Sequence, residues 1–219
     1  MAQGYVRAAD LPQVIPVFPL DGVLLLPRGL LPLNIFEPRY LNMVDDAMAG
    51  DRIIGMIQPA GGPRRLPSLS PVGCAGRITS FAETSDGRYL ITLTGCSRFR
   101  VQAELPVQTP YRQVRAQFAP FEGDLVAPPA GEGALDRENL LEALRAYLET
   151  RGLDIDWETA ETAPPEALVN SLAMALPFEP PEKQALLEAP DLDGRAAVLT
   201  ALMRIDAAGD GDGEMGSIQ

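Results

Sequence analysis

The segment spanning residues 14–44, VIPVFPLDGVLLLPRGLLPLNIFEPRYLNMV, is strongly apolar, yet proline interrupts it five times. A membrane-spanning helix needs roughly 20 mostly apolar residues in one unbroken helical run. Proline removes a backbone donor and clashes with the preceding helical turn, so such a helix cannot form here. We therefore expect short, buried extended pieces that turn at Asp21-Gly22.

The formal net charge of −12 is unevenly distributed over the 219 residues. Residues 1–121 contain 12 arginines against 9 acidic residues, whereas residues 122–219 contain 6 basic against 21 acidic residues. This asymmetry predicts two regions with different surfaces. Phosphate contacts supply most of the non-specific affinity for nucleic acids. The acidic half is therefore expected to repel them, while the mildly basic half leaves RNA binding open.

Residues for common catalytic and metal chemistry are scarce. The chain has no histidine, two cysteines (Cys74 and Cys96) and a single lysine, Lys183. Histidine-based triads are thereby excluded, and two isolated cysteines do not suffice for a Cys/His metal site. No G-x-x-x-x-G-K-[ST] pattern occurs, so there is no P-loop. We therefore expect no catalytic residue, no metal site, no cofactor and no enzymatic activity.

Lys183 is the only candidate base for a Ser-Lys dyad, and it lies in EPPEKQALLE among three glutamates. On an exposed helix these carboxylates would favour the charged lysine, which is the wrong state for a general base. The N-terminus shows no basic segment followed by an uninterrupted apolar core. No signal peptide is expected, and the expected location is the cytoplasm, where two cysteines stay reduced.

The first 120 or so residues read mostly as strand, with one helix. Residues 73–82 and 88–95 flank Ser85-Asp86-Gly87, a turn sequence that predicts a β-hairpin. A short apolar run at 52–58 and alternating segments at 98–101 and 114–118 add further strands, so a small barrel or sandwich is expected. Pro38 is placed to open a helix that ends at Gly50.

The rest of the chain reads as helix. Residues 123–134, GDLVAPPAGEGA, have the composition of a linker. Helical periodicity follows at 140–148, 165–176, 180–187 and 193–203. From residue 207 the chain is polar and glycine-rich and is expected to be disordered.

Two stretches resemble the N-terminal domain of Lon-type ATP-dependent proteases. In FPLDGVLLLPRGLLPLNIFEPRYLNMV the matching positions are Pro19-Leu20, Val23–Leu26, Pro27, Ile35–Glu37 and Arg39-Tyr40. In VGCAGRITSFAETSDGRYLITLTGCSRFRV they are Val72, Gly73, Ile78, Gly95, Arg98 and Phe99. The segment LPFEPPEKQALLEAPDLDGRAAVLTALM resembles the helical half of the same family, so the resemblance covers about residues 12–205.

The resemblance implies an α+β fold in which a PUA-like β-barrel or pseudobarrel is followed by a C-terminal helical bundle. We expect a β-rich domain at 1–122, a linker at 123–134, a helical subdomain at 135–206 and a disordered tail at 207–219. The chain looks like a stand-alone substrate-binding domain without the ATPase and peptidase modules. It is expected to bind peptides or unfolded protein segments, as an adaptor or chaperone-like factor in protein quality control, with a protease or chaperone as a further partner.

The residues expected to form the peptide-binding site are Leu33, Phe36, Glu37, Arg39 and Tyr40. For the three apolar residues, core packing is the competing interpretation. Glu37 and Arg39 have a local alternative: Glu37 beside the positive helix N-terminus, and Arg39 paired nearby.

Two further alternatives remain open. Arg98, Arg100, Arg112 and Arg115 could form an arginine face that contacts RNA or a modified nucleotide, as in some PUA-type domains, although no aromatic platform interleaves with them. Cys74 and Cys96 lie on opposite arms of the predicted hairpin, so a regulatory disulfide is conceivable, but buried reduced thiols are commoner in the cytosol.

Overall fold

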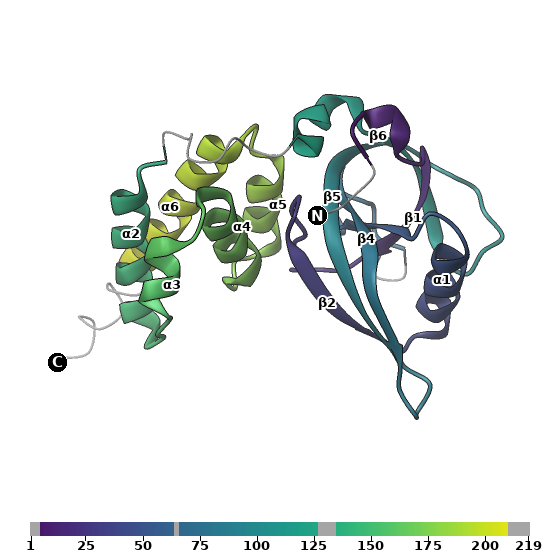
Figure 1. Ribbon diagram of the computed structural model, residues 1–219, viewed down its shortest axis with the longest axis horizontal. Coiled ribbons are helices and arrows are strands. Elements are labelled where there is room, and N and C mark those ends of the chain that lie inside the picture. The colour runs from purple at the N-terminus through teal and green to yellow at the C-terminus, as the bar shows by residue number, and fades with distance from the viewer. Residues whose placement is uncertain (1–4, 64–65, 127–134, 210–219) are drawn as a thin grey trace. The chain divides into compact units, whose positions relative to one another are not determined.

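The computed structural model describes residues 5–63, 66–126 and 135–209. Its contacts divide the chain into two units, and Figure 1 labels most of their helices and strands. The β-rich unit comprises Met1–Ala127 and Pro177–Leu187, and the helical unit comprises Pro128–Leu176 and Glu188–Gln219. The α+β class expected from the sequence is confirmed.

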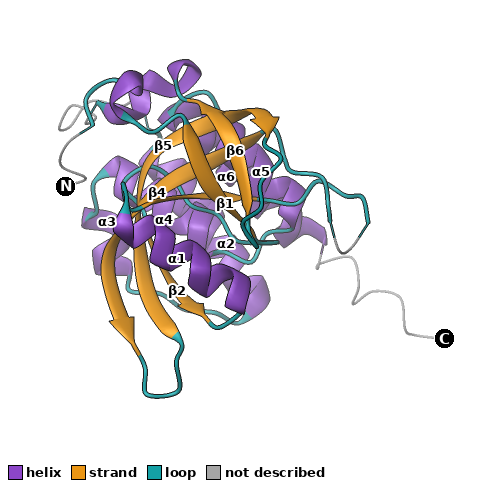
Figure 2. Ribbon diagram, turned by 90° about the vertical axis from the view of Figure 1, so that its right-hand side faces the viewer, coloured by secondary structure: helices purple, strands orange, loops and turns teal. Residues whose placement is uncertain are grey.

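The β-rich unit is built on a six-stranded sheet ordered β2-β5-β4-β3-β1-β6, in which β5 also pairs with β6. Five strands therefore pair in a closed ring, and β2 is attached to it along β5. Figure 2 shows β4 and β5 joined by a tight turn at the tip of the predicted hairpin, which the structure confirms. The strands are β1 (Val14–Pro19), β2 (Leu30–Ile35), β3 (Ile53–Ile57), β4 (Val72–Glu83), β5 (Tyr89–Glu104) and β6 (Arg112–Gln117).

Four short helices belong to the same unit: η1 (Ala8–Asp10), α1 (Pro38–Ala49), η2 (Ala119–Leu125) and α5 (Pro180–Glu188). The predicted helix opened by Pro38 and ended by Gly50 is α1, with Pro38 in its first turn. Between β1 and β2 the chain turns at Gly22, whose φ of 68° glycine adopts without strain. Leu24, Leu25 and Leu26 follow this turn as buried residues outside any strand.

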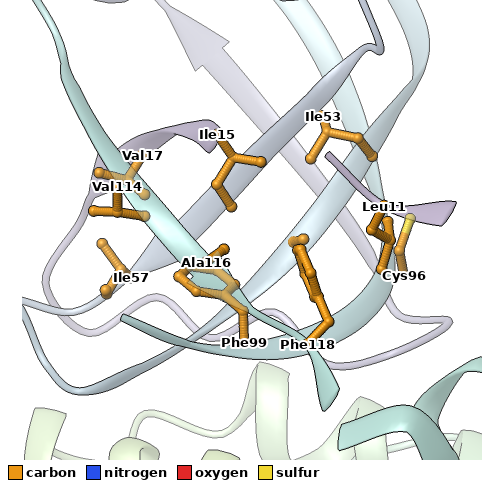
Figure 3. Close-up of a cluster of buried hydrophobic side chains, with 11 residues drawn as sticks. Leu11, Ile15, Val17, Ile53, Ile57, Cys96, Phe99, Val114, Ala116 and Phe118 are labelled. Atoms are coloured by element: carbon orange, nitrogen blue, oxygen red, sulfur yellow. The ribbon is translucent and has the colours of Figure 1, made fainter. Parts of the chain in front are cut away.

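Phe99 fills the interior of the ring, among the buried side chains drawn in Figure 3. A Cβ atom at Gly73 would lie 2.6 Å from the Phe99 ring and 2.6 Å from the main-chain oxygen of Met56. At Gly55 a Cβ atom would lie 2.9 Å from the same ring. Glycine at these two positions therefore makes room for the phenylalanine, because real Cβ atoms do not approach so closely.

Gly95 marks a close approach between two backbones. A Cβ atom there would lie 2.0 Å from the main-chain oxygen of Leu26. Gly95 also accepts a hydrogen bond from the Arg28 N–H at 2.8 Å and donates one to the Gly29 oxygen at 2.9 Å. These contacts hold the proline-broken segment against β5.

Arg98 is buried, so it is not available for the arginine face considered from the sequence. It is 4% exposed and forms a two-pronged ion pair with Asp124, with Nε and Nη2 at 2.9 and 2.8 Å from the carboxylate oxygens. Asp124 also accepts the Arg98 backbone N–H at 2.9 Å. Asp124 falls in the segment 123–134 that was expected to be a linker. Residues 123–125 of that segment are part of η2 instead, and residues 127–134 lie outside the described residues.

The helical unit contains α2 (Arg137–Arg151), α3 (Trp157–Thr162), α4 (Pro165–Ala175) and α6 (Leu192–Gly209). The predicted helices at 140–148, 165–176 and 193–203 correspond to α2, α4 and α6. The short helix α3 was not expected; Asp156 caps it by accepting the Thr159 N–H at 3.2 Å. Helix α6 extends through Gly209, so residues 207–209 of the expected tail are helical, and the remainder lies outside the described residues.

Helix α5 groups with the β-rich unit, although the sequence placed it within a helical subdomain at 135–206. Its Gln184 amide donates to the main-chain oxygen of Val72 at 3.1 Å, and the Gln58 amide donates to Gln184 at 3.2 Å. Lys183 on this helix is 4% exposed, so the expectation of an exposed lysine is wrong. Burial lowers the pKa of Lys183. The neighbouring glutamates were expected to favour the charged lysine, which would raise that pKa instead.

Candidate functional site

A cavity of about 490 Å³ opens beside the first turn of α1, and we call it the Arg39 pocket. Its volume lies within the range of roughly 300–1,000 Å³ typical of ligand pockets. The pocket belongs entirely to the β-rich unit and is lined by Pro19, Arg39, Tyr40, Leu66, Pro67, Pro110, Tyr111 and Arg112.

Tyr40 and Tyr111 give the Arg39 pocket its aromatic walls. Tyr40 is 6% exposed, and its ring centroid lies 4.1 Å from that of Phe18 on β1, so strand packing holds it in place. The Tyr111 hydroxyl donates to Asp46 Oδ2 on α1 at 2.6 Å. Burial and this hydrogen bond raise the pKa of Tyr111 to about 12, so the phenol stays neutral at physiological pH.

The two arginines of the pocket both have carboxylate partners nearby. Arg39 lies over the Tyr40 ring at 4.5 Å and pairs with Glu37 at 2.8 Å, with both side chains about half exposed (50% and 45%). Arg112 is held more firmly, because it forms two 2.6 Å hydrogen bonds with Glu104 and donates to the Pro67 oxygen at 2.8 Å. Arg39 is therefore the guanidinium that a ligand reaches more readily.

A smaller cavity of about 170 Å³ lies toward the other end of α1, and we call it the Asp51 pocket. Tyr111 lines both pockets. The other lining residues are Pro12, Val14, Ile15, Pro16, Asp46, Ala47, Gly50, Asp51, Arg52, Ile53 and Gln113.

The five residues expected to bind peptide do not all meet. Arg39 and Tyr40 line the Arg39 pocket, whereas Leu33 pairs with Ile91 across β2 and β5. Phe36 is 64% exposed, so core packing does not account for it, while it does account for Tyr40. Glu37 immediately precedes α1, but its side chain does not cap the helix. It pairs with Arg39, so the local pairing considered for Arg39 is present.

Most of the remaining lining was not identified from the sequence. Pro19 ends β1, Leu66 and Pro67 lie between β3 and β4, and Pro110 and Tyr111 precede β6. They are brought together because β1 pairs antiparallel with β6, with Val17 opposite Arg112. No local pattern indicates that pairing, although the cluster Pro110-Tyr111-Arg112 includes residue types common in binding surfaces.

Two of the four arginines of the expected RNA-binding face are held in ion pairs. Arg98 is buried against Asp124, and Arg112 is paired with Glu104. Arg100 and Arg115 remain exposed on β5 and β6. Two exposed arginines alone supply little of the phosphate neutralisation that RNA affinity needs.

Both cysteines are buried as free thiols. Burial raises the pKa of Cys96 to about 11, so its thiol is almost entirely protonated at neutral pH. Within the described residues no three His, Cys, Asp or Glu side chains are grouped to hold a metal ion. The described helices include none that is long and apolar enough to cross a membrane.

Residues 14–204 match the sequence model of a family described as the ATP-dependent protease La (LON) substrate-binding domain. The chain belongs to the Lon substrate-binding domain family. A solved Lon N-terminal domain protein from Xanthomonas campestris is 26% identical, with a TM-score of 0.60 over 86% of this chain and 97% of that chain. The N-terminal domain of a Mycobacterium avium complex Lon protease superposes with a TM-score of 0.61 at 18% identity, over 87% of this chain and 97% of that chain, which supports the fold alone.

Full-length Lon proteases match over their substrate-binding part. The Lon protease of Desulfosudis oleivorans is 26% identical over 195 residues, which are 87% of this chain and 24% of that protein. Lon protease 2 of Myxococcus xanthus is 27% identical over 217 residues, which cover 91% of this chain and again 24% of that protein. The chain thus spans about a quarter of the length of the curated relatives it matches. The match is confined to the substrate-binding domain of the family.

Proposed function

We propose that the β-rich unit binds extended, apolar segments of unfolded proteins or peptides in the Arg39 pocket. The observation that carries the proposal is the lining, in which two tyrosines, three prolines and a leucine surround a cavity of about 490 Å³. Aromatic and arginine side chains are enriched where proteins bind other chains. Membership of a substrate-binding family supports the same conclusion.

One lining residue of the pocket and one residue near Arg39 in the sequence are strongly exposed apolar side chains. Leu66 at the pocket rim is 62% exposed, and Phe36, just before α1, is 64% exposed. Covering such side chains with an apolar ligand removes apolar surface from water and is favourable by about 25 cal/mol per Å². A segment of unfolded protein offers the matching apolar groups.

The broader role that we propose is non-catalytic. The protein would capture unfolded segments in the cytoplasm and present them to a protease or chaperone, as an adaptor or chaperone-like factor in quality control. An RNA-binding role has less support, since Arg98 and Arg112 are held in ion pairs. Of the five candidate residues, we assign Arg39 and Tyr40 to the pocket, and Leu33, Phe36 and Glu37 to its surroundings.

The experiment that tests this role is calorimetric titration of the full chain with a ten-residue peptide rich in Leu and Phe. Leu66→Ser removes an exposed apolar contact at the pocket and is expected to weaken binding about five-fold. The matched control is Leu90→Ser, since Leu90 is 46% exposed on β5 and does not line the pocket. Equal effects of the two substitutions, or no peptide binding at all, would refute the proposal.

A further inference from the structure

We propose that the Arg39 pocket and the Asp51 pocket form one groove that selects an extended peptide carrying an acidic and a basic side chain three to five residues apart. The acidic side chain would lie at Arg39, and the basic side chain at Asp46 and Asp51. This inference rests on the proposed function and adds the class of peptide that the site prefers.

The two pockets are neighbours along the same elements. Both are bordered by β1, α1 and β6, and both include the Tyr111 side chain. The hydrogen bond from Tyr111, beside β6, to Asp46 on α1 marks the boundary between them. A peptide that fills both pockets therefore runs along α1 and over Tyr111.

The two ends of the groove present different charged groups. The Arg39 pocket is lined by two arginines and no acidic residue, whereas the Asp51 pocket is lined by Asp46, Asp51 and Arg52, a net charge of −1. The macrodipole of α1 favours the same arrangement of peptide charges. Its positive N-terminus lies at Arg39 and its negative C-terminus lies beside Gly50. Both arginines also have carboxylate partners, Glu37 and Glu104, so the groove presents guanidinium donors at one end and carboxylate acceptors at the other.

The Asp51 pocket suits a lysine or arginine side chain in shape as well as charge. Its apolar lining includes Val14, Pro16 and Ala47, and its carboxylates are those of two exposed residues, Asp46 and Asp51. Long basic side chains bury an aliphatic stem against apolar surface and keep the charged head near water. A cavity of about 170 Å³ with apolar walls and carboxylates meets both requirements.

The spacing follows from the length of α1. Asp46 lies seven positions after Arg39, and Gly50 lies eleven positions after it, which at about 1.5 Å per residue gives roughly 10–16 Å. An extended chain advances about 3.3 Å per residue. The two charges of the peptide are accordingly expected three to five residues apart.

Glu37 acts as an internal competitor for the acidic end. In the structure it occupies Arg39 at 2.8 Å, with both side chains about half exposed. Exposed pairs of this kind contribute little net free energy, so a peptide carboxylate can replace Glu37 at small cost. Removing the Glu37 charge should therefore strengthen binding of acidic peptides.

The test uses three ten-residue peptides with blocked ends and one central Phe, titrated into the full chain by calorimetry at low salt. The first has Asp and Lys four residues apart, the second has the same residues adjacent, and the third replaces them with Asn and Gln. The first two share composition and net charge, so they isolate spacing. We expect the first peptide to bind about five-fold more tightly than the other two.

Protein variants locate each charge. Arg39→Gln removes the partner of the peptide Asp, so it should abolish most of the affinity advantage of the first peptide and leave the affinity of the neutral third peptide unchanged. Asp51→Asn removes a partner of the peptide Lys and should have the same selective effect. Glu37→Gln should increase affinity for the first peptide. The matched control is Arg100→Gln, an exposed arginine on β5 outside both pockets.

The outcomes separate the two proposals. If all three peptides bind equally while Leu66→Ser still weakens binding, the charge-pair inference is overturned and the apolar binding role stands. If the spaced peptide binds best but Arg39→Gln and Asp51→Asn have no peptide-dependent effect, the assignment of the charges to this groove is overturned. If none of the peptides binds, both proposals fail.

Discussion

The contacts that pair strands in the β-rich unit span longer stretches of sequence than those that set the helix ends of the helical unit. In the β-rich unit, β1 pairs with β6, so Val14 lies opposite Arg115, and Gly95 touches the backbone at Leu26. In the helical unit, the ends of α2 are set by its own neighbours: Asp136 accepts the Asn139 N–H at 3.1 Å, and Gly152 adopts φ 61° after the last turn. Side chains in the first unit thus meet partners distant in sequence, while helix ends in the second depend on adjacent residues.

Glycine illustrates the difference. Gly95 is required because another backbone occupies the space where its side chain would be, although its own backbone has no positive φ. A Cβ atom at Gly152 would meet nothing within 4 Å, so glycine is required there for its left-handed φ alone. The same residue type therefore serves tertiary packing in one unit and local helix termination in the other.

Each unit carries its own reporter of unfolding. Both cysteines lie in β4 and β5 and are buried, so thiol labelling requires the β-rich unit to open. Trp157 is the only tryptophan of the chain and lies in the helical unit, where the Arg145 guanidinium is 4.8 Å from its ring. Substitutions in one unit can thus be compared with substitutions in the other.

The largest effect is expected for Arg98→Ala. The substitution leaves the Asp124 carboxylate, in a residue 8% exposed, without its guanidinium partner. Breaking a buried ion pair in this way costs about 3–5 kcal/mol. Urea titration followed by thiol labelling should show the loss. The exposed control Arg100→Ala should change the free energy of unfolding by less than about 0.5 kcal/mol. Equal effects of the two substitutions would show that the ion pair between Arg98 and Asp124 does not stabilise the β-rich unit.

Gly95→Ala is expected to cost somewhat less, about 3 kcal/mol, because the backbone at Leu26 must move to admit a methyl group. The measurement is again the thiol-labelling midpoint in urea. Gly123→Ala in η2 is the control, since a Cβ atom there meets nothing within 4 Å and φ is not positive. A Gly95→Ala protein as stable as the parent would show that the Leu26 segment is free to shift.

Gly152→Ala should cost only about 1 kcal/mol, because alanine is strained at a left-handed φ. The shift is expected in the Trp157 fluorescence transition. If the thiol-labelling midpoint falls by the same amount, the two units unfold together and the comparison between them does not extend to their stabilities.

The smallest effect on stability is expected for Glu37→Gln. The pair with Arg39 is about half exposed, and such pairs contribute about 0–1 kcal/mol. Both unfolding transitions should move by less than about 0.5 kcal/mol, in low and high salt alike. A larger loss would assign Glu37 a structural role and remove the basis for treating it as a competitor of peptide carboxylates.

Local signals account for the elements that the sequence predicted well. The helix opened by Pro38, the turn at Ser85-Asp86-Gly87 and the helical periodicity of α2 all depend on residues close together in the chain. The missed helix α3 also has a local signal, the Asp156 cap, but six residues are too few to show periodicity. Composition misled the interpretation of residues 123–125, because a short glycine-containing segment reads as linker whether or not Asp124 has a partner.

The candidate site was only partly accessible to sequence reasoning. Arg39 and Tyr40 were identified because they fall in a family motif at the start of a helix. Pro110 and Tyr111 reach the pocket because β1 pairs with β6, two segments almost a hundred residues apart in the sequence. No pattern in the sequence indicates which strands pair. The burial of Lys183 likewise depends on α5 grouping with the β-rich unit.

By itself, the sequence determined that the proline-broken segment could not be a membrane helix, that a hairpin and several helices would form, and that the chain resembles the Lon substrate-binding family. These conclusions follow from backbone chemistry and short-range patterns, which are properties of neighbouring residues. Only the tertiary structure decided that Arg98 meets Asp124, that Gly95 touches the Leu26 backbone and that Tyr111 lines two pockets beside α1. Those contacts depend on how strands close into a ring, which no local segment encodes.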